Sequence, residues 1–257
     1  MIGICPLASG SKGNCIFIGT EKTRILIDAG ISTKNIKERL AHLGIDIETI
    51  NAVIVSHEHT DHIQGIKVLA SKYGIPIMAN AETAKAIART CDDCPKFKIF
   101  TTGDTFEYNE LEIHPFRIQH DAVEPVAFTI KTGNHKIGVC TDLGFAGKLV
   151  QSQLKGCDIL YVESNHDEEL VRQSKRPPVY KQRVLGKSGH LSNDACAELL
   201  CDIACDRLQH VYLAHLSKEC NSPEIAFEKV DSVLKRHGIT LPLSIAEQDT
   251  VSRVTLF

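Results

Sequence analysis

One stretch constrains this chain more than any other, because Ser56-His57-Glu58-His59-Thr60-Asp61-His62 places four potential metal ligands within six residues. The apolar, β-branched run 52–55 precedes it and is typical of a buried strand. Apolar residues at helical spacing follow over 63–73. The ligands, in the order H-x-H-x-D-H, are therefore predicted to lie in a loop between a strand and a helix. Their density indicates a metal site rather than a polar loop with incidental histidines.

Composition excludes several classes of protein. The 257 residues carry a net charge of −3, so no global basic field marks a nucleic-acid-binding chain. No apolar run approaches the roughly 20 residues that a membrane span needs, and the first residues lack the regions of a signal peptide. We therefore expect a cytoplasmic protein that does not enter the membrane.

The ten cysteines are scattered, and without an export signal we expect reduced thiols that are mostly small core residues. Cys91 and Cys94 form the one C-x-x-C pair. It could hold half of a structural zinc site or a redox centre, but no second C-x-x-C accompanies it.

Apolar runs alternate between the spacing of strands and that of helices, without a linker or a low-complexity tract. The Gly- and Asn-containing segment 9–14 suits either a plain hairpin turn or tight backbone near a ligand, and both interpretations stay open. Strands are expected at 24–27, 52–55, 75–78, 126–131, 135–140, 158–162, 210–214 and 251–256, with further short ones in 2–28 and 98–118, and helices at 33–43, 63–73, 81–90, 145–154, 193–204 and 223–236.

One local pattern occurs twice. Asp28-Ala29-Gly30 ends a strand and precedes a helix, a strand and the His57 loop. Asp142-Leu143-Gly144 ends a later strand and precedes the same order, which closes on the polar loop Glu163-Ser164-Asn165-His166. The repetition suggests two similar halves whose loops meet at one site, although so short a pattern can also arise by chance.

Further histidines and carboxylates follow predicted strands. His120 opens a polar loop, Asp142 is bracketed by small residues, and His215 follows a strand directly. Side chains at strand ends form the active sites of layered α/β folds. Ligands of two kinds suit two metals better than one, because a carboxylate can bridge two cations. Nitrogen and oxygen donors without a thiolate suit Zn²⁺ or Mn²⁺ and also admit iron.

Together with Asp28, these residues resemble the ordered motifs of the metallo-β-lactamase superfamily over essentially the whole chain. The resemblance implies one domain over 1–257 with an α/β fold, a four-layer αββα sandwich of two mixed β-sheets flanked by helices. Asp28 would support the His loop without binding metal. The aspartate at position 142 and the lack of Cys in the His loop depart from the lactam-cleaving enzymes. The implied ligands are His57, His59 and His120 for the first metal, Asp61, His62 and His215 for the second, and Asp142 as the bridge.

Three later motifs, 161–166, 187–193 and 214–217, resemble those of ribonuclease J and the β-CASP nucleases. By this resemblance Glu163 orients His190, which protonates the leaving group. Only 26 residues separate Glu163 from His190, so there is no room for the large cap domain of those nucleases. The chain therefore resembles the capless YycJ/WalJ-type proteins, with which 5′-to-3′ exonuclease action on double-stranded DNA is associated.

A basic stretch lies between the motifs 161–166 and 187–193, with no acidic residue between positions 172 and 187. Pro177-Pro178 is expected to break any helix there, which predicts a loop-bearing segment. Such a segment could contact phosphates, and a solvated surface is the alternative. Tyr180 is its single aromatic residue, so we expect contact with the nucleic-acid backbone rather than base stacking. The basic residues are Arg172, Lys175, Arg176, Lys181, Arg183 and Lys187.

The resemblance implies a dinuclear metal-dependent hydrolase, a phosphodiesterase or nuclease acting on DNA by attack of a metal-bridged hydroxide. Asp61 would orient the hydroxide as well as bind metal, and His190 would donate the proton to the leaving oxygen. A small-molecule hydrolase for a thioester, lactone or cyclic phosphodiester would use the same ligands with a closed apolar pocket. A redox protein with two irons is a further alternative, but no Gly-rich flavin fingerprint is visible. A non-catalytic scaffold would have lost ligands, and all seven are present.

Overall fold

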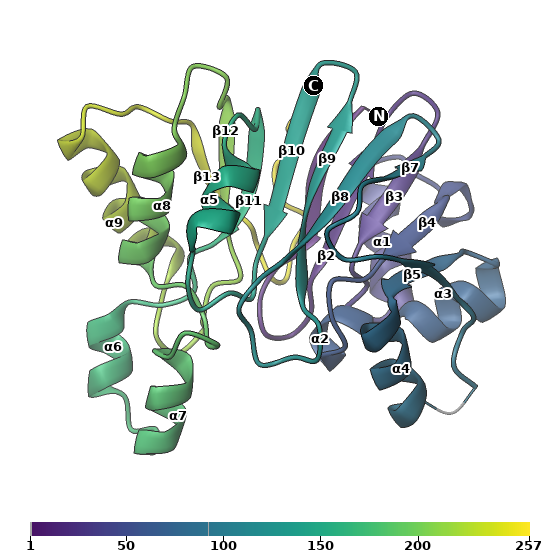
Figure 1. Cartoon of the computed structure of the whole chain (residues 1–257), viewed down its shortest axis with the longest axis horizontal. Helices are drawn as coiled ribbons and strands as arrows, with labels where there is room; N and C mark the ends of the chain where they lie inside the picture. Colours follow the sequence, from purple (N-terminus) through teal and green to yellow (C-terminus); the bar gives the residue numbers. More distant parts are fainter. Residues whose placement is uncertain (1, 92) are drawn as a thin grey trace. The chain divides into compact units, whose positions relative to one another are not determined.

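The computed structural model describes residues 2–91 and 93–257, which form two compact units (Figure 1). The first unit holds the residues up to Pro115, Ala122–Val126 and Ala246–Phe257. The second holds Phe116–Asp121 and Ala127–Ile245. The single domain expected over 1–257 stays a prediction.

One mixed sheet runs in the order β1-β2-β3-β4-β5-β6. Its first three strands are antiparallel, and β3 to β6 are parallel, so their carboxyl ends lie at one edge. Buried residues of the strands, such as Leu26 and Val53, pack with Ile36 and Leu40 of the first helix. The strands are β1 (Gly3–Ala8), β2 (Cys15–Gly19), β3 (Arg24–Ile27), β4 (Ala52–Ile54), β5 (Ile77–Asn80) and β6 (Phe97–Phe100), and the helices are α1 (Thr33–His42), η1 (Ile47–Thr49), α2 (Thr60–Ile63), α3 (Ile66–Tyr73) and α4 (Ala81–Thr90).

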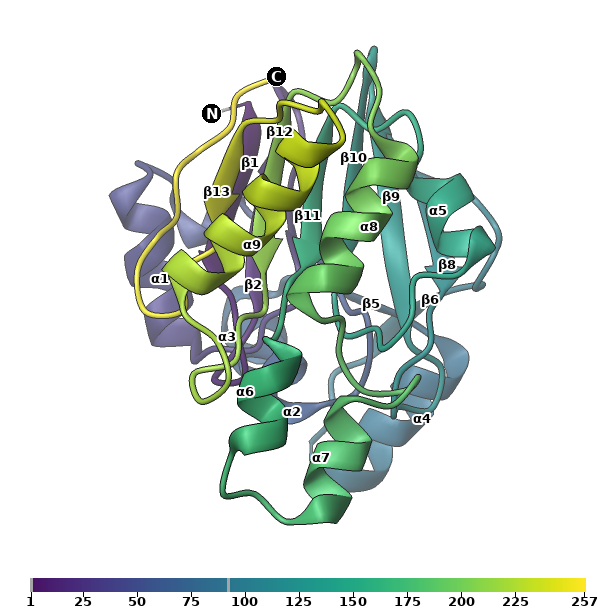
Figure 2. The same cartoon turned by 90° about the vertical axis from the view of Figure 1, so that its left-hand side faces the viewer.

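The second mixed sheet runs in the order β13-β12-β11-β10-β9-β8-β7, and its strands β10 to β13 are parallel. Figure 2 shows α8 and α9 side by side across one face of β11 and β12. The strands are β7 (Phe106–Tyr108), β8 (Leu111–Arg117), β9 (Val126–Thr132), β10 (His135–Cys140), β11 (Ile159–Glu163), β12 (His210–Ala214) and β13 (Leu243–Ile245), and the helices are α5 (Lys148–Leu154), α6 (Glu168–Gln173), α7 (Pro178–Val184), α8 (Asn193–Ile203) and α9 (Pro223–Arg236).

Several predicted elements are confirmed, among them the helices 81–90 and 223–236 and the strand 210–214. The single helix predicted over 63–73 is wrong, because α2 ends at Ile63 and α3 begins at Ile66. The N–H of Gly65 donates to Ala29 O at 2.8 Å instead of continuing a helix. A side chain at Gly65 would also come within 2.8 Å of Ile31 O, so the break is built into the packing.

The strand predicted at 251–256 is also wrong, and β13 was missed. Thr255 makes only an isolated bridge with Ile4, and Ser252 N–H donates to Pro6 O at 3.0 Å. Pro6 has no N–H to donate, so the terminal segment cannot form a continuous ladder with β1.

The helix break predicted at Pro177-Pro178 is confirmed, because α6 ends at Gln173 and α7 begins at Pro178. The loop between them spans only 174–177, and the two short helices carry the rest of the basic stretch, which was not predicted. Pro178 is the first residue of α7, where a missing N–H costs nothing. Val171 and Val184 pack with Cys220 in a small cluster beneath these helices. Among the described residues, no helix is both long and apolar enough to cross a bilayer.

Candidate metal centre

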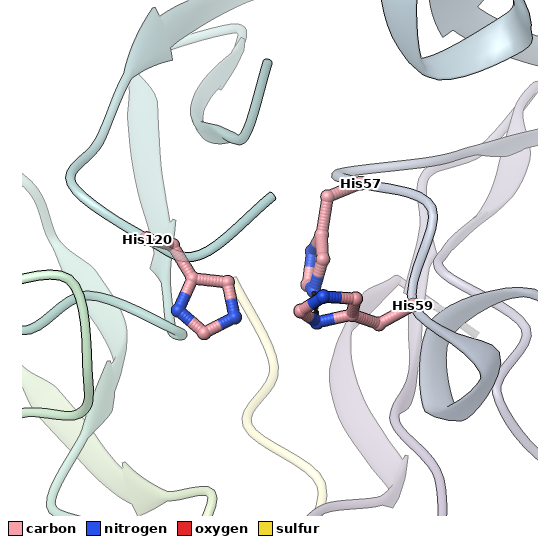
Figure 3. A group of neighbouring side chains, drawn as sticks. All are labelled: His57, His59 and His120. Carbon is pink, nitrogen blue, oxygen red and sulfur yellow. Dashed lines mark hydrogen bonds between the residues drawn. The ribbon is translucent and has the colours of Figure 1, made fainter. Parts of the chain in front are cut away.

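The loop after β4 gathers three imidazole rings in the first unit. His57 and His62 are buried, and their ring centroids lie 4.0 Å apart. The ring of His59 meets that of His57 edge to face, with centroids 4.7 Å apart (Figure 3). His57 Nε2 lies 3.1 Å from His59 Nδ1, so ring nitrogens of the two side chains converge on one point.

Asp28, which follows β3, holds this loop from behind. Its Oδ1 accepts the backbone N–H of Ser56 at 2.7 Å, and its Oδ2 lies 2.8 Å from His62 Nδ1. The hydroxyl of Ser56 donates to Asp28 Oδ2 at 2.8 Å and lies 2.9 Å from His57 Nδ1. Asp28 therefore orients His62 directly and His57 through the Ser56 hydroxyl, in both cases at Nδ1, which leaves the Nε2 atoms available to a ligand.

The segment 9–14 joins β1 to β2 and also lines this half of the site. The buried Asn14 donates its backbone N–H to Asp61 O at 2.8 Å, and its Oδ1 accepts from Gly10 N–H at 2.8 Å. Its Nδ2 lies 3.0 Å from His62 Nε2 and 3.4 Å from Asp61 Oδ2. Gly30 completes the contact, since a Cβ there would come within 1.6 Å of Asp61 O. The segment is thus a hairpin connection and a part of the site at once.

Glu163, fully buried at the end of β11, organises the second unit. Its Oε1 lies 2.8 Å from His190 Nδ1 and 2.7 Å from His215 Nδ1. Its Oε2 accepts the N–H groups of Leu143 at 2.9 Å and Leu191 at 3.0 Å. Burial raises the pKa of Glu163, but the charge and hydrogen bonds of His190 and His215 outweigh burial and lower the pKa to about 2. The sequence indicated the contact with His190 and missed the one with His215.

Asp142, which follows β10, lies beside the same histidines. Its Oδ1 is 3.5 Å from His215 Nδ1 and 3.9 Å from both His190 Nδ1 and His120 Nε2. Asp142 and His215 are buried, and ligand atoms of Asp142, Glu163, His190 and His215 all lie within 4.8 Å of one another. His120 Nδ1 lies 3.2 Å from Gly189 O, which anchors a further imidazole (labelled in Figure 3).

Strained backbone marks these strand ends. Asp28, Asp142 and His215 have φ angles of 59°, 60° and 55°, in the left-handed region that residues other than glycine seldom adopt. Each follows directly or closely on a parallel strand, so the backbone turns there to aim a side chain. Residues held in this way cluster at functional sites.

The donor atoms of the candidate ligands in each unit suit divalent cations. Imidazole nitrogens and carboxylate oxygens suit zinc, manganese or iron, and contacts at Nδ1 of His57, His62 and His215 fix the rings as in known metal sites. The first unit holds His57, His59, Asp61 and His62 with Asp28, and the second holds His120, Asp142, Glu163, His190 and His215.

The predicted basic stretch is partly neutralised. Arg172 Nη2 lies 2.7 Å from Glu168 Oε2, and Arg183 Nε lies 3.1 Å from Asp121 Oδ2. Arg176 pairs with Glu219 in the same way. The acidic partners lie outside the window 172–187, so the sequence pattern did not reveal them. Lys175 and Lys187 are exposed, and Lys187 Nζ lies over the ring of Phe145.

The ten cysteines are thiols, as predicted. Burial raises the pKa values of Cys5, Cys157 and Cys196 to about 12, so these thiols stay protonated in the core. Cys91 and Cys94 are half-buried, and Asp92 between them lies outside the described residues.

Known proteins resemble this chain over nearly its whole length. Residues 23–216 match the family described as "Beta-lactamase superfamily domain". The chain is 36% identical over 247 residues to exodeoxyribonuclease YycJ of Bacillus anthracis. The aligned region covers 95% of this chain and 93% of the relative. The chain is 34% identical over 248 residues to exodeoxyribonuclease WalJ of Streptococcus pneumoniae, covering 95% and 92%. The crystal structure of YhfI from Bacillus subtilis, a metallo-β-lactamase fold protein, matches with a TM-score of 0.73 at 17% identity and covers 96% of this chain and 97% of that one. These matches confirm the predicted fold class.

Proposed function

Because the chain belongs to the metallo-β-lactamase superfamily and is a metal-dependent hydrolase of YycJ/WalJ type, we propose that it is a dinuclear exonuclease that degrades DNA from the 5′ end. Two relatives named exodeoxyribonucleases match it over 95% of its length, which supports DNA over RNA and over small esters. The observation that carries the proposal is the single carboxylate of Glu163, which orients a predicted ligand and a predicted general acid together. The expected cytoplasmic location stays a prediction.

The ligands would be shared between two cations, zinc or manganese, with iron as a further candidate. Support comes from the ordered motifs of the family and from the contacts at Nδ1 in each unit. We assign His57, His59 and His120 to the first metal, Asp61, His62 and His215 to the second, and Asp142 to a bridging position.

When bound, the cations supply an activated water and offset the negative charge that develops on the phosphoryl oxygens. The chain's own residues would do the rest. Asp61, whose backbone is held by Asn14, orients the attacking water through its carboxylate. His190 has its Nδ1 fixed on Glu163, so its Nε2 is directed away from that carboxylate and can donate a proton to the leaving oxygen. The side chain of His190 is 24% exposed whereas that of Glu163 is fully buried, which suits a proton donor and its support.

The test uses protein reconstituted separately with zinc and with manganese. It is given single- and double-stranded DNA and RNA labelled at the 5′ or the 3′ end, with Asp61→Ala as the control. We expect metal-dependent shortening of DNA from the 5′ end that Asp61→Ala abolishes. Intact polymers in protein that carries two metals per chain would refute the nuclease and make a small ester or cyclic phosphodiester the leading substrate.

A further inference from the structure

A cavity of about 350 Å³ lies within the second unit, between the loop after Asp142, α5 and α8. None of the proposed metal ligands lines it. The chain nevertheless ties it to the site, because Leu191 in its wall follows His190 and Gly144 comes two residues after Asp142. Its volume falls at the lower end of ligand pockets, which suits one small ring system.

The wall of the cavity carries an exposed aromatic ring. Phe145 is 50% exposed, and Lys187 Nζ lies 5.6 Å from its ring centroid. Gly144 makes this pairing possible, since a Cβ at that position would come within 2.4 Å of Gly186 O and 2.5 Å of Lys187 C. The ring therefore stands beside a cation, the combination with which proteins bind single-stranded nucleic acid.

The polar groups at the rim of the cavity indicate whether it would bind a base or a phosphate. Glu198 and Asp202 are exposed acids on α8, and Gln151 Nε2 donates to Asp202 Oδ2 at 2.9 Å. Lys148 also lines the cavity, but two carboxylates against one ammonium leave its lining net negative, which disfavours a phosphate. The carboxylates can accept hydrogen bonds from the N–H groups of a heterocycle. The apolar walls from Leu191, Ala195 and Leu199 complement a flat ring.

We propose that this cavity binds one unpaired nucleobase of the DNA strand being degraded, stacked on Phe145, while Lys187 contacts the adjoining phosphate. The inference rests on the proposed function and adds a binding site to it. It places base stacking outside the basic stretch 172–187, in which Tyr180 is the single aromatic residue.

The test is a double-mutant cycle that removes the DNA base, the Phe145 ring, or both. A tetrahydrofuran abasic residue is moved through the first four nucleotides of the degraded strand, and kcat/KM is measured for the wild type and for Phe145→Ala. At one position, loss of the base lowers wild-type kcat/KM about tenfold, within the range measured for a single base–aromatic stack. On the intact strand, Phe145→Ala lowers kcat/KM by the same factor. On the abasic strand, Phe145→Ala has no further effect on kcat/KM.

Two variants serve as controls. Phe145→Tyr keeps the ring and therefore keeps the discrimination between intact and abasic strands. Leu149→Ala removes an apolar side chain of α5 that is 49% exposed and does not line the cavity, so it also discriminates as the wild type does. If Phe145→Ala still discriminates, or if the wild type treats all abasic strands as intact ones, the cavity does not bind a base.

A second measurement separates this inference from the nuclease proposal. Fluorescence anisotropy in EDTA gives the Kd of intact and abasic single-stranded oligonucleotides without cleavage. For the wild type, we expect the Kd of the abasic strand to be about tenfold higher than that of the intact strand. For Phe145→Ala, we expect the two strands to have equal Kd values. If no DNA is cut in the activity assay but this difference is found, the nuclease fails and the base site stands. If DNA is cut and neither assay shows the difference, only the base site fails.

Discussion

Nδ1 of His215 lies 2.7 Å from Oε1 of Glu163, a fully buried carboxylate at the end of β11. In the first unit, Nδ1 of His62 lies 2.8 Å from Oδ2 of Asp28. Each unit thus buries one acid that fixes a histidine by its Nδ1, and in known metal sites such outer partners are worth 10- to 100-fold in metal affinity. We therefore expect metal affinity to depend on these two acids as well as on the ligands.

Glu163→Gln should lower the affinity for the metal by about 10- to 100-fold, because the neutral side chain no longer orients His215 through a charged hydrogen bond. Competition with a chromogenic chelator measures the affinity, and circular dichroism checks the fold. Glu168→Gln is the matched control, since Glu168 is a partly exposed acid that pairs with Arg172. Equal affinity in wild type and Glu163→Gln would show that the carboxylate is dispensable.

His190→Ala should lower kcat by about 10²- to 10⁴-fold while two metals per chain stay bound, because His190 is assigned to proton transfer. His215→Ala should instead lose metal. Turnover and elemental analysis on the same samples separate the two roles. If His190→Ala loses as much metal as His215→Ala, then His190 is a ligand and not a general acid.

Asn14→Ala should destabilise the protein by about 1–3 kcal/mol, because Gly10 N–H loses its buried acceptor. It should also lower metal affinity, since the amide lies between Asp61 and His62. Urea unfolding and chelator competition measure the two effects. Asn35→Ala, at an exposed position of α1, controls for loss of an amide. A stability loss with unchanged metal affinity would leave Asn14 a purely structural residue.

The double variant Lys175→Ala/Lys187→Ala should weaken DNA binding more than Arg172→Ala/Arg176→Ala, because both arginines are already paired with glutamates. Removing one lysine that binds a phosphate should reduce the slope of log K against log salt by about 0.9. Binding isotherms at several salt concentrations give the slopes. Equal slopes in the wild type and the lysine variant would show that the basic stretch is a solvated surface that does not contact the DNA phosphates.

Local patterns carried most of what the sequence could predict. H-x-H-x-D-H is short, and the apolar runs around it predict a strand before it and helical structure after it from local spacing alone. The site residues of the second unit are harder, because Glu163 and His215 are 52 positions apart and no local spacing joins them. The motif resemblance named both residues and gave no sign of their contact.

Tertiary context overruled the sequence elsewhere. The helix predicted over 63–73 breaks where Gly65 bonds to Ala29, a contact that no periodicity shows. Glu219 and Asp121 neutralise basic residues from outside the stretch that looked uniformly positive. The cavity beside Phe145 is formed by residues from 144–151 and 191–202, which are distant in the sequence, so neither its walls nor its rim could be predicted from local patterns.

Crystals grown with manganese and with zinc, measured at each metal's absorption edge, test the central claim most directly. We predict two anomalous peaks about 3.5–4 Å apart, with His57, His59 and His120 around one, Asp61, His62 and His215 around the other, and Asp142 between them. A single peak, or peaks at Cys91 and Cys94 instead of the histidines, would contradict the dinuclear centre on which the proposed function depends.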